Sequence, residues 1–140
     1  GTAEEVAKMT AIRLFHIKRF LGDNVYIARG VNTPRPRAGD FEILISYSGE
    51  TKPVVNWGNI FKNLGGTVLS IVGNKGSPLA ENSDLKILLE ERVKPGRPRR
   101  FYMRTAFVLS YLPILLTERL SQKGLKLPEY ILKWYHSVIE

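Results

Sequence analysis

The order of apolar and polar residues along the chain predicts helices that alternate with strands. Residues 3–21 carry apolar side chains at three- and four-residue spacings, with two glutamates in the first turn, which is typical of an amphipathic helix. A short apolar strand is expected over residues 25–28, and residues 41–46 form a near-continuous apolar run, typical of a strand covered on both faces. A second helix is expected over residues 52–64, and the glycine pair 65–66 ends it.

The alternation continues in the second half of the chain. β-branched residues predict a strand over residues 67–72, and one helical turn over residues 77–81 leads to a further buried strand over residues 85–89. A long helix is expected over residues 101–122, where Pro113 should kink the helix or split it in two.

This pattern predicts one α/β domain over residues 1–140, a three-layer αβα sandwich with a parallel sheet. In such sheets ligands bind at the carboxyl ends of the strands. Residues 46–51, Ser-Tyr-Ser-Gly-Glu-Thr, lie at such an end, between a strand and a helix. Their hydroxyls, their glycine and the N–H groups of the following helix suit a phosphate group. The same turn would also serve as an ordinary helix cap, with Thr51 or Ser48 as the N-cap.

Charge and composition narrow the choice of partner. The net charge of +8 and the pI near 9.9 make nucleic acid a candidate. The basic residues, however, gather in segments rich in proline and glycine, without a basic helix face, so we expect an anionic small molecule and no nucleic acid. No apolar run is long enough to span a bilayer, and we expect no membrane partner. The lack of cysteine fits a cytoplasmic protein, and with only two histidines we expect no metal and no cofactor.

The turn and the segments that follow it resemble the sugar isomerase (SIS) domain family, and within it the single-domain 6-phospho-3-hexuloisomerases. The resemblance rests on the Ser-x-Ser-Gly-Glu-Thr string, the helix and strand after it, Gly73-Asn74, residues 77–80 and Asp84. It implies a flavodoxin-like sheet and an isomerase that acts on a sugar phosphate such as a hexulose 6-phosphate. It also implies that the phosphate is held by Ser46, Ser48, Gly49, Glu50 and Thr51.

One departure from the family pattern concerns the sheet. In the family a strand precedes the first helix and lies in the middle of the sheet, between the strands that we expect at residues 25–28 and 41–46. No residues for that strand stand before residue 3. Because buried strand edges need hydrogen-bond partners, we expect that the chain is shortened at its N-terminus or that another segment supplies the strand.

A second departure concerns the catalytic base that isomerisation requires. Hexuloisomerases carry a Pro-Met-Gly motif and then a glutamate at the head of the long helix, whereas residues 99–105 contain no carboxylate. The remaining candidates are Glu50 in the turn, and His136 with Glu140, which lie four residues apart on a last helix expected from Pro128. Glu50 in the first turn of a helix would also offset the helix dipole, and His136 would also fit a role in packing.

The long helix is apolar over much of its circumference, which predicts that it packs against a second copy of the chain, in a dimer or tetramer. Two functions remain, a phosphosugar isomerase and a non-catalytic phosphosugar-binding module that senses a metabolite. The missing motif carboxylate favours the sensor. The absence of an attached DNA-binding segment favours the isomerase, which is the function that we expect.

Overall fold

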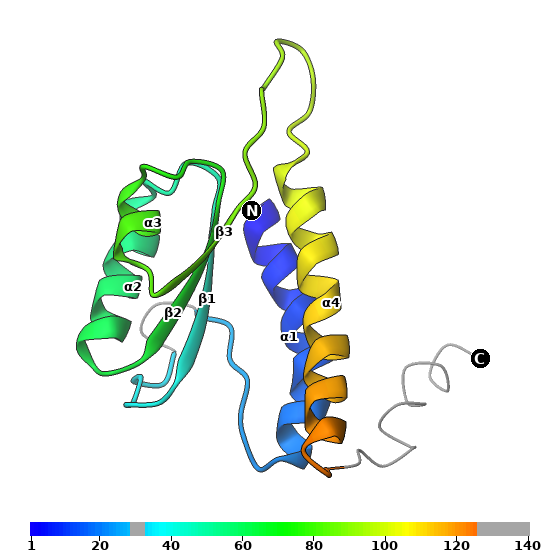
Figure 1. Cartoon of the computed structure of the whole chain (residues 1–140). Helices are drawn as coiled ribbons and strands as arrows, with labels where there is room; N and C mark the ends of the chain where they lie inside the picture. The colour runs from blue at the N-terminus through cyan, green and yellow to red at the C-terminus, as the bar shows by residue number, and fades with distance from the viewer. Residues whose placement is uncertain (29–32, 126–140) are drawn as a thin grey trace.

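The computed structural model of the protein describes residues 1–28 and 33–125. Its three strands are parallel and lie in the order β1-β2-β3. Figure 1 shows α2 and α3 on one face of this sheet and α1 and α4 on the other, so the expected αβα sandwich is confirmed. The elements are α1 (Thr2–Phe20), β1 (Phe41–Ser46), α2 (Lys52–Asn63), β2 (Thr67–Val72), α3 (Pro78–Asn82), β3 (Leu85–Leu88) and α4 (Phe101–Gln122).

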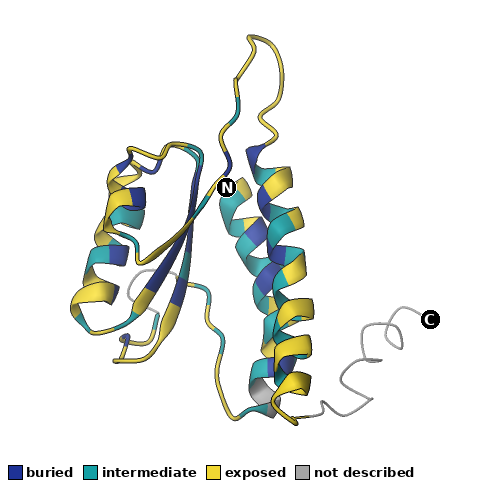
Figure 2. Ribbon diagram, viewed as in Figure 1, coloured by how far each residue is buried: buried dark blue, intermediate teal, exposed yellow. Residues whose placement is uncertain are grey.

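The core has two layers because successive side chains of a strand point to opposite faces of the sheet. On one face, Leu44 of β1 packs in a cluster with Phe61 of α2. On the other face, its neighbour Ile45 packs with Phe101 of α4 and with Val6 of α1. Figure 2 shows the buried residues concentrated along β1 and β2 and on the helix sides that face them. β1 is therefore covered on both faces, as its apolar sequence predicts.

Several elements have the bounds that the sequence predicts, among them β1, β2 and α4. α2 ends as expected at the glycine pair, where Gly65 adopts a φ of 84°, a conformation that favours glycine. α4, however, continues through Pro113 as one helix and is not split. The proline removes a single backbone hydrogen bond, and α4 packs along α1.

The strand expected over residues 25–28 is not formed. A parallel strand needs a hydrogen-bonded neighbour, and no described strand lies between these residues and β1. Tyr26 is accordingly 60% exposed. β1 has β2 as its one neighbour in the described part of the chain, and its other edge is open.

The expected burial of the last strand is also wrong. β3 lies at the edge of the sheet, where Leu85 is 52% exposed and Leu88 is 38% exposed. Only Leu89, directly after the strand, is buried. A continuous apolar run does not distinguish an inner strand from an edge strand, because the local sequence does not show which strands lie beside it in the sheet.

The helix expected from Pro128, with His136 and Glu140, lies outside the described residues. Within residues 1–28 and 33–125, none of the helices combines the length and the apolar composition that crossing a membrane requires.

Candidate functional site

The turn between β1 and α2 is held together by its own hydroxyl groups. The buried Ser46 hydroxyl accepts a hydrogen bond from the Gly49 N–H at 3.1 Å and lies 3.2 Å from the Thr51 hydroxyl. The Ser48 hydroxyl accepts from the Glu50 N–H at 3.2 Å. Ser48, Glu50 and Thr51 are exposed, so the turn presents two hydroxyl groups to an incoming ligand.

Gly49 allows α3 to approach the turn closely. It adopts a φ of 68°, and a Cβ atom at this position would collide with the side chain of Ser77. The Leu79 N–H donates to the Gly49 carbonyl at 3.1 Å, which ties α3 to the turn. Both the backbone conformation and the available space therefore exclude a side chain at residue 49.

The first turn of α2 leaves backbone donors free beside these hydroxyls. Thr51 is the N-cap residue by position, but its hydroxyl makes no capping bond to the helix and instead contacts Ser46. Pro53 has no N–H, and within the described residues the N–H groups of Thr51 and Lys52 have no acceptor. Free donors at the positive end of a helix dipole attract anions. The turn thus has more donor capacity than a simple helix cap uses.

Tyr47 connects the turn to the start of α4. The Gly73 N–H donates to the Tyr47 carbonyl at 2.9 Å, and the Tyr47 ring meets the Phe101 ring edge to face at 5.4 Å between centroids. The guanidinium carbon of Arg99 lies 4.4 Å from the Tyr47 ring centroid, within cation–π range. In the sequence, Arg99 is one of several basic residues in a segment rich in proline and glycine. No local spacing reveals this contact, because it joins two distant parts of the chain.

Glu50 is the one expected catalytic residue that the structure describes. Its side chain is exposed in the turn and makes no hydrogen bond or ion pair with any residue in the described ranges. His136 and Glu140 lie outside those ranges, so their positions relative to Glu50 are not described. The described part of the chain contains no group of three or more histidine, aspartate or glutamate residues that could hold a metal ion.

Asp84, which contributes to the resemblance, has a structural role at the opposite end of the sheet. Its Oδ2 accepts from the Val68 N–H at 2.8 Å, and its Oδ1 lies 3.3 Å from the Lys62 ammonium. The hydrogen bond from Val68, with a further contribution from Lys62, holds the pKa of Asp84 below its ordinary value. Asp84 therefore joins β2, β3 and α2 where the strands begin, and it lies away from the turn.

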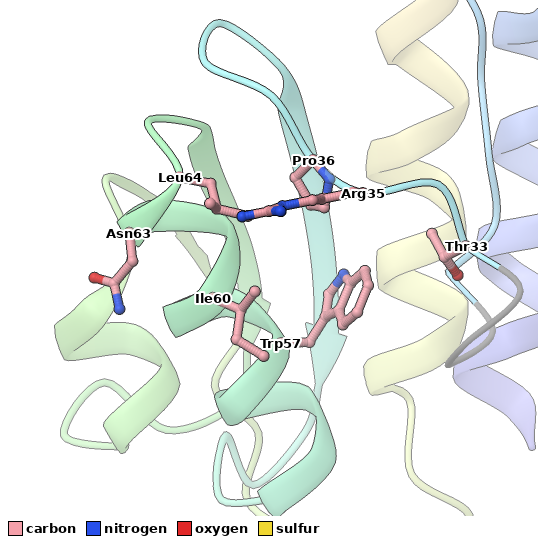
Figure 3. A pocket seen from close by; sticks show the side chains of 7 residues that line it. All are labelled: Thr33, Arg35, Pro36, Trp57, Ile60, Asn63 and Leu64. Atoms are coloured by element: carbon pink, nitrogen blue, oxygen red, sulfur yellow. The ribbon is translucent and has the colours of Figure 1, made fainter.

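Glu42 of β1 is a buried carboxyl group that belongs to none of the sequence motifs. It is 9% exposed, and burial raises its pKa to about 7, although a hydrogen bond from Trp57 acts in the opposite direction. Its Oε2 has no hydrogen-bond partner among the described residues. Trp57 also lines a pocket of about 610 Å³ at the C-terminal half of α2 (Figure 3). The other lining residues are Thr33, Arg35, Pro36, Ile60, Asn63 and Leu64.

Related sequences agree with this architecture. An uncharacterised protein of Archaeoglobus fulgidus is 32% identical over 147 residues, an alignment that covers 100% of this chain and 77% of that protein. The 3-hexulose-6-phosphate isomerase of Bacillus subtilis is 33% identical over 99 residues, which cover 71% of this chain and 49% of the relative. The matches to proteins of Aeropyrum pernix and Methanothermobacter thermautotrophicus likewise cover about half of those relatives, 47% and 49%.

Solved structures are also similar to this chain. A Methanococcus jannaschii protein, for which a 3-hexulose-6-phosphate isomerase function has been inferred, is 28% identical with a TM-score of 0.71 over 97% of this chain and 72% of that one. The Vibrio vulnificus NanR protein in complex with ManNAc-6P has a TM-score of 0.74 over 99% of this chain and 52% of its own, and its 20% identity supports the fold alone. The SIS domain model matches residues 1–113, which include the turn, the whole sheet and the head of α4, so the chain belongs to the SIS domain family.

Proposed function

We propose that the protein is a phosphosugar isomerase that moves a proton between adjacent carbons of a sugar phosphate such as a hexulose 6-phosphate. The observation that carries the proposal is the turn between β1 and α2, where free N–H groups and exposed hydroxyls meet at the start of a helix. The similarity to the Bacillus subtilis isomerase and to the Methanococcus jannaschii protein favours an isomerase over a non-catalytic sensor.

In this proposal the turn binds the phosphate group and leaves the carbonyl end of the sugar free to react. The hydroxyls of Ser48 and Thr51 and the N–H of Lys52 donate to the phosphate oxygens. The buried Ser46 hydroxyl contacts the Thr51 hydroxyl and fixes its position, and Gly49 has no side chain that would crowd the turn. Neutral donors at a helix N-terminus attract anions through the partial positive charge of the helix dipole.

Proton transfer needs a base close to the carbon that loses its proton. We assign this role to His136, with Glu50 or Glu140 as the carboxylate that assists it. Imidazole suits this chemistry because its ordinary pKa lies near neutral pH. A cytoplasmic location is part of the same proposal.

The activity can be tested by solvent exchange, which does not require the product to be known. Purified protein is incubated with D-fructose 6-phosphate in D₂O, and loss of the proton next to the carbonyl group is followed by NMR. We expect exchange with the wild type and none with His136→Asn. With Thr51→Ala we expect exchange that needs a higher sugar phosphate concentration to reach half of its maximal rate. Binding without exchange in the wild type would instead identify a sensor.

We further propose that the protein forms a homo-oligomer through α4. The exposed apolar residues of this helix recur at intervals of three to four residues and therefore form one stripe along its surface. A stripe of this kind is typical of a face that a partner covers. It consists of Met103 (67% exposed), Phe107 (65%), Tyr111 (50%), Ile114 (52%) and Leu115 (56%).

A further inference from the structure

The segment between β3 and α4 is strongly basic and lies at the same end of the sheet as the turn. Figure 1 shows it rising from the end of β3 and returning to the head of α4, at the end of the sheet where β1 also ends. Parallel strands bring their carboxyl ends to one edge, so this segment borders the region where ligands bind. Its cations are Arg92, Lys94, Arg97, Arg99 and Arg100, and its carboxylates are Glu90 and Glu91.

The base of this segment is anchored on both sides. The Arg100 N–H donates to Oε2 of Glu91 at 2.9 Å, and Nη1 of Arg104 donates to the Glu90 carbonyl at 2.7 Å. Phe101, the first residue of α4, is fully buried. Arg99 directly precedes these anchored residues, so its backbone position is set by the core.

The side chain of Arg99 lies over the Tyr47 ring, which is itself held in place. One side of the ring meets Phe101, and a Cβ atom at Gly73 would lie 2.6 Å from the ring, so the backbone of Gly73 packs closely against it. Stacking occupies one face of the guanidinium group and leaves the N–H donors in its plane available. No carboxylate within residues 1–28 and 33–125 forms an ion pair with Arg99. A positive charge with free donors is thereby placed at Tyr47, the second residue of the turn.

We propose that Arg99 is a second anion-binding residue of this site and that it binds the phosphate group of the ligand together with the turn. This inference rests on the proposed function and deepens it. The turn itself offers neutral donors and carries the negative charge of Glu50, which opposes a dianion. Arg99 supplies the compensating charge, and Tyr47 positions it. The favoured ligand is therefore a phosphate monoester rather than a neutral sugar.

The test compares two arginines of the same segment. Arg99→Gln removes the charge over Tyr47, and the matched control Arg97→Gln removes a charge from an exposed turn of the segment. Binding of D-fructose 6-phosphate and of inorganic phosphate is measured by calorimetry at fixed ionic strength, and thermal unfolding checks that each variant is folded. We expect Arg99→Gln to weaken both affinities about tenfold or more, because hydrogen bonds to charged groups are strong. Arg97→Gln should stay within about twofold of the wild type, since distant exposed charges are screened by salt.

Thr51→Ala separates this inference from the proposed function. If Thr51→Ala loses affinity while Arg99→Gln binds as tightly as the wild type, the turn binds phosphate and the role of Arg99 is wrong. If Arg97→Gln weakens binding as much as Arg99→Gln, the segment acts through its overall charge, which also overturns the assignment to Arg99. If the wild type binds neither fructose 6-phosphate nor phosphate, the proposed function fails and the role of Arg99 fails with it.

Discussion

Replacement of Glu42 by glutamine should stabilise the protein at alkaline pH. The carboxyl group of Glu42 is buried beneath α2, and its Oε2 lacks a hydrogen-bond partner in the described structure. Above its raised pKa of about 7 the group must carry a charge in this environment, which costs free energy. The glutamine side chain has nearly the same shape and carries no charge.

The size of the effect follows from the pKa. The unfolded chain binds this proton with an ordinary pKa of 4.5 and the folded protein with a pKa of about 7. The folded state therefore holds more protons between these values, and its stability falls as the pH rises through this window. At about 1.4 kcal/mol per pH unit the loss would reach about 3 kcal/mol, and residual solvent contact reduces it to about 1–2 kcal/mol.

Urea unfolding at pH 5 and pH 8, followed by circular dichroism, measures the difference. We expect Glu42→Gln to have a higher free energy of unfolding than the wild type at pH 8, by about 1–2 kcal/mol, and a much smaller difference at pH 5. Glu118→Gln, on the exposed side of α4, controls for the change in net charge and should stay within about 0.5 kcal/mol of the wild type. An equal difference between Glu42→Gln and the wild type at both pH values would refute the reasoning.

Three further variants test other parts of the structure. Gly49→Ala should lower the free energy of unfolding by about 1–3 kcal/mol in urea titrations, since the new Cβ meets Ser77 and the φ is positive; unchanged stability would contradict the close approach of α3. Asp84→Asn should destabilise the protein at pH 7 but not at pH values well below 3.8, because the hydrogen bond from Val68 favours the ionised carboxylate; a loss of equal size at both pH values would exclude this electrostatic cause. Phe107→Glu should convert the oligomer to a monomer in light scattering after gel filtration, and a wild-type monomer would disprove the proposed interface.

The sequence predicts the elements that have strong local signals. β2 follows from its β-branched residues, α2 from its periodicity and from Gly65, and the turn before α2 from its place between a strand and a helix. The failures concern long-range pairing. Residues 25–28 have the composition of a strand but lack a neighbour, and β3 is apolar although it lies at an edge. Local composition shows that a segment favours the strand conformation, whereas pairing with a neighbouring strand decides whether the strand forms.

The local parts of the candidate site could be predicted from the sequence, whereas its long-range contacts could not. The turn is contiguous in sequence, so its place between a strand and a helix, with its hydroxyls and its glycine, could be predicted from the local sequence. The contact between Arg99 and Tyr47 could not be predicted in this way, because it depends on the path of the chain from β3 to α4. Glu42 could have been found, since a glutamate inside a strand covered on both faces is buried whichever face it occupies.

Among the residues that the structure describes, one edge of β1 has no strand beside it. An unpaired edge presents a row of backbone donors and acceptors, which a strand of another molecule can use as a template. β3, the opposite edge, carries the exposed Lys86, and exposed charge on an edge strand discourages such pairing. β1 exposes Phe41 instead, and its single charged residue is turned inward. Aggregation of this chain should therefore begin at β1, and Phe41→Lys should reduce aggregation in concentrated samples.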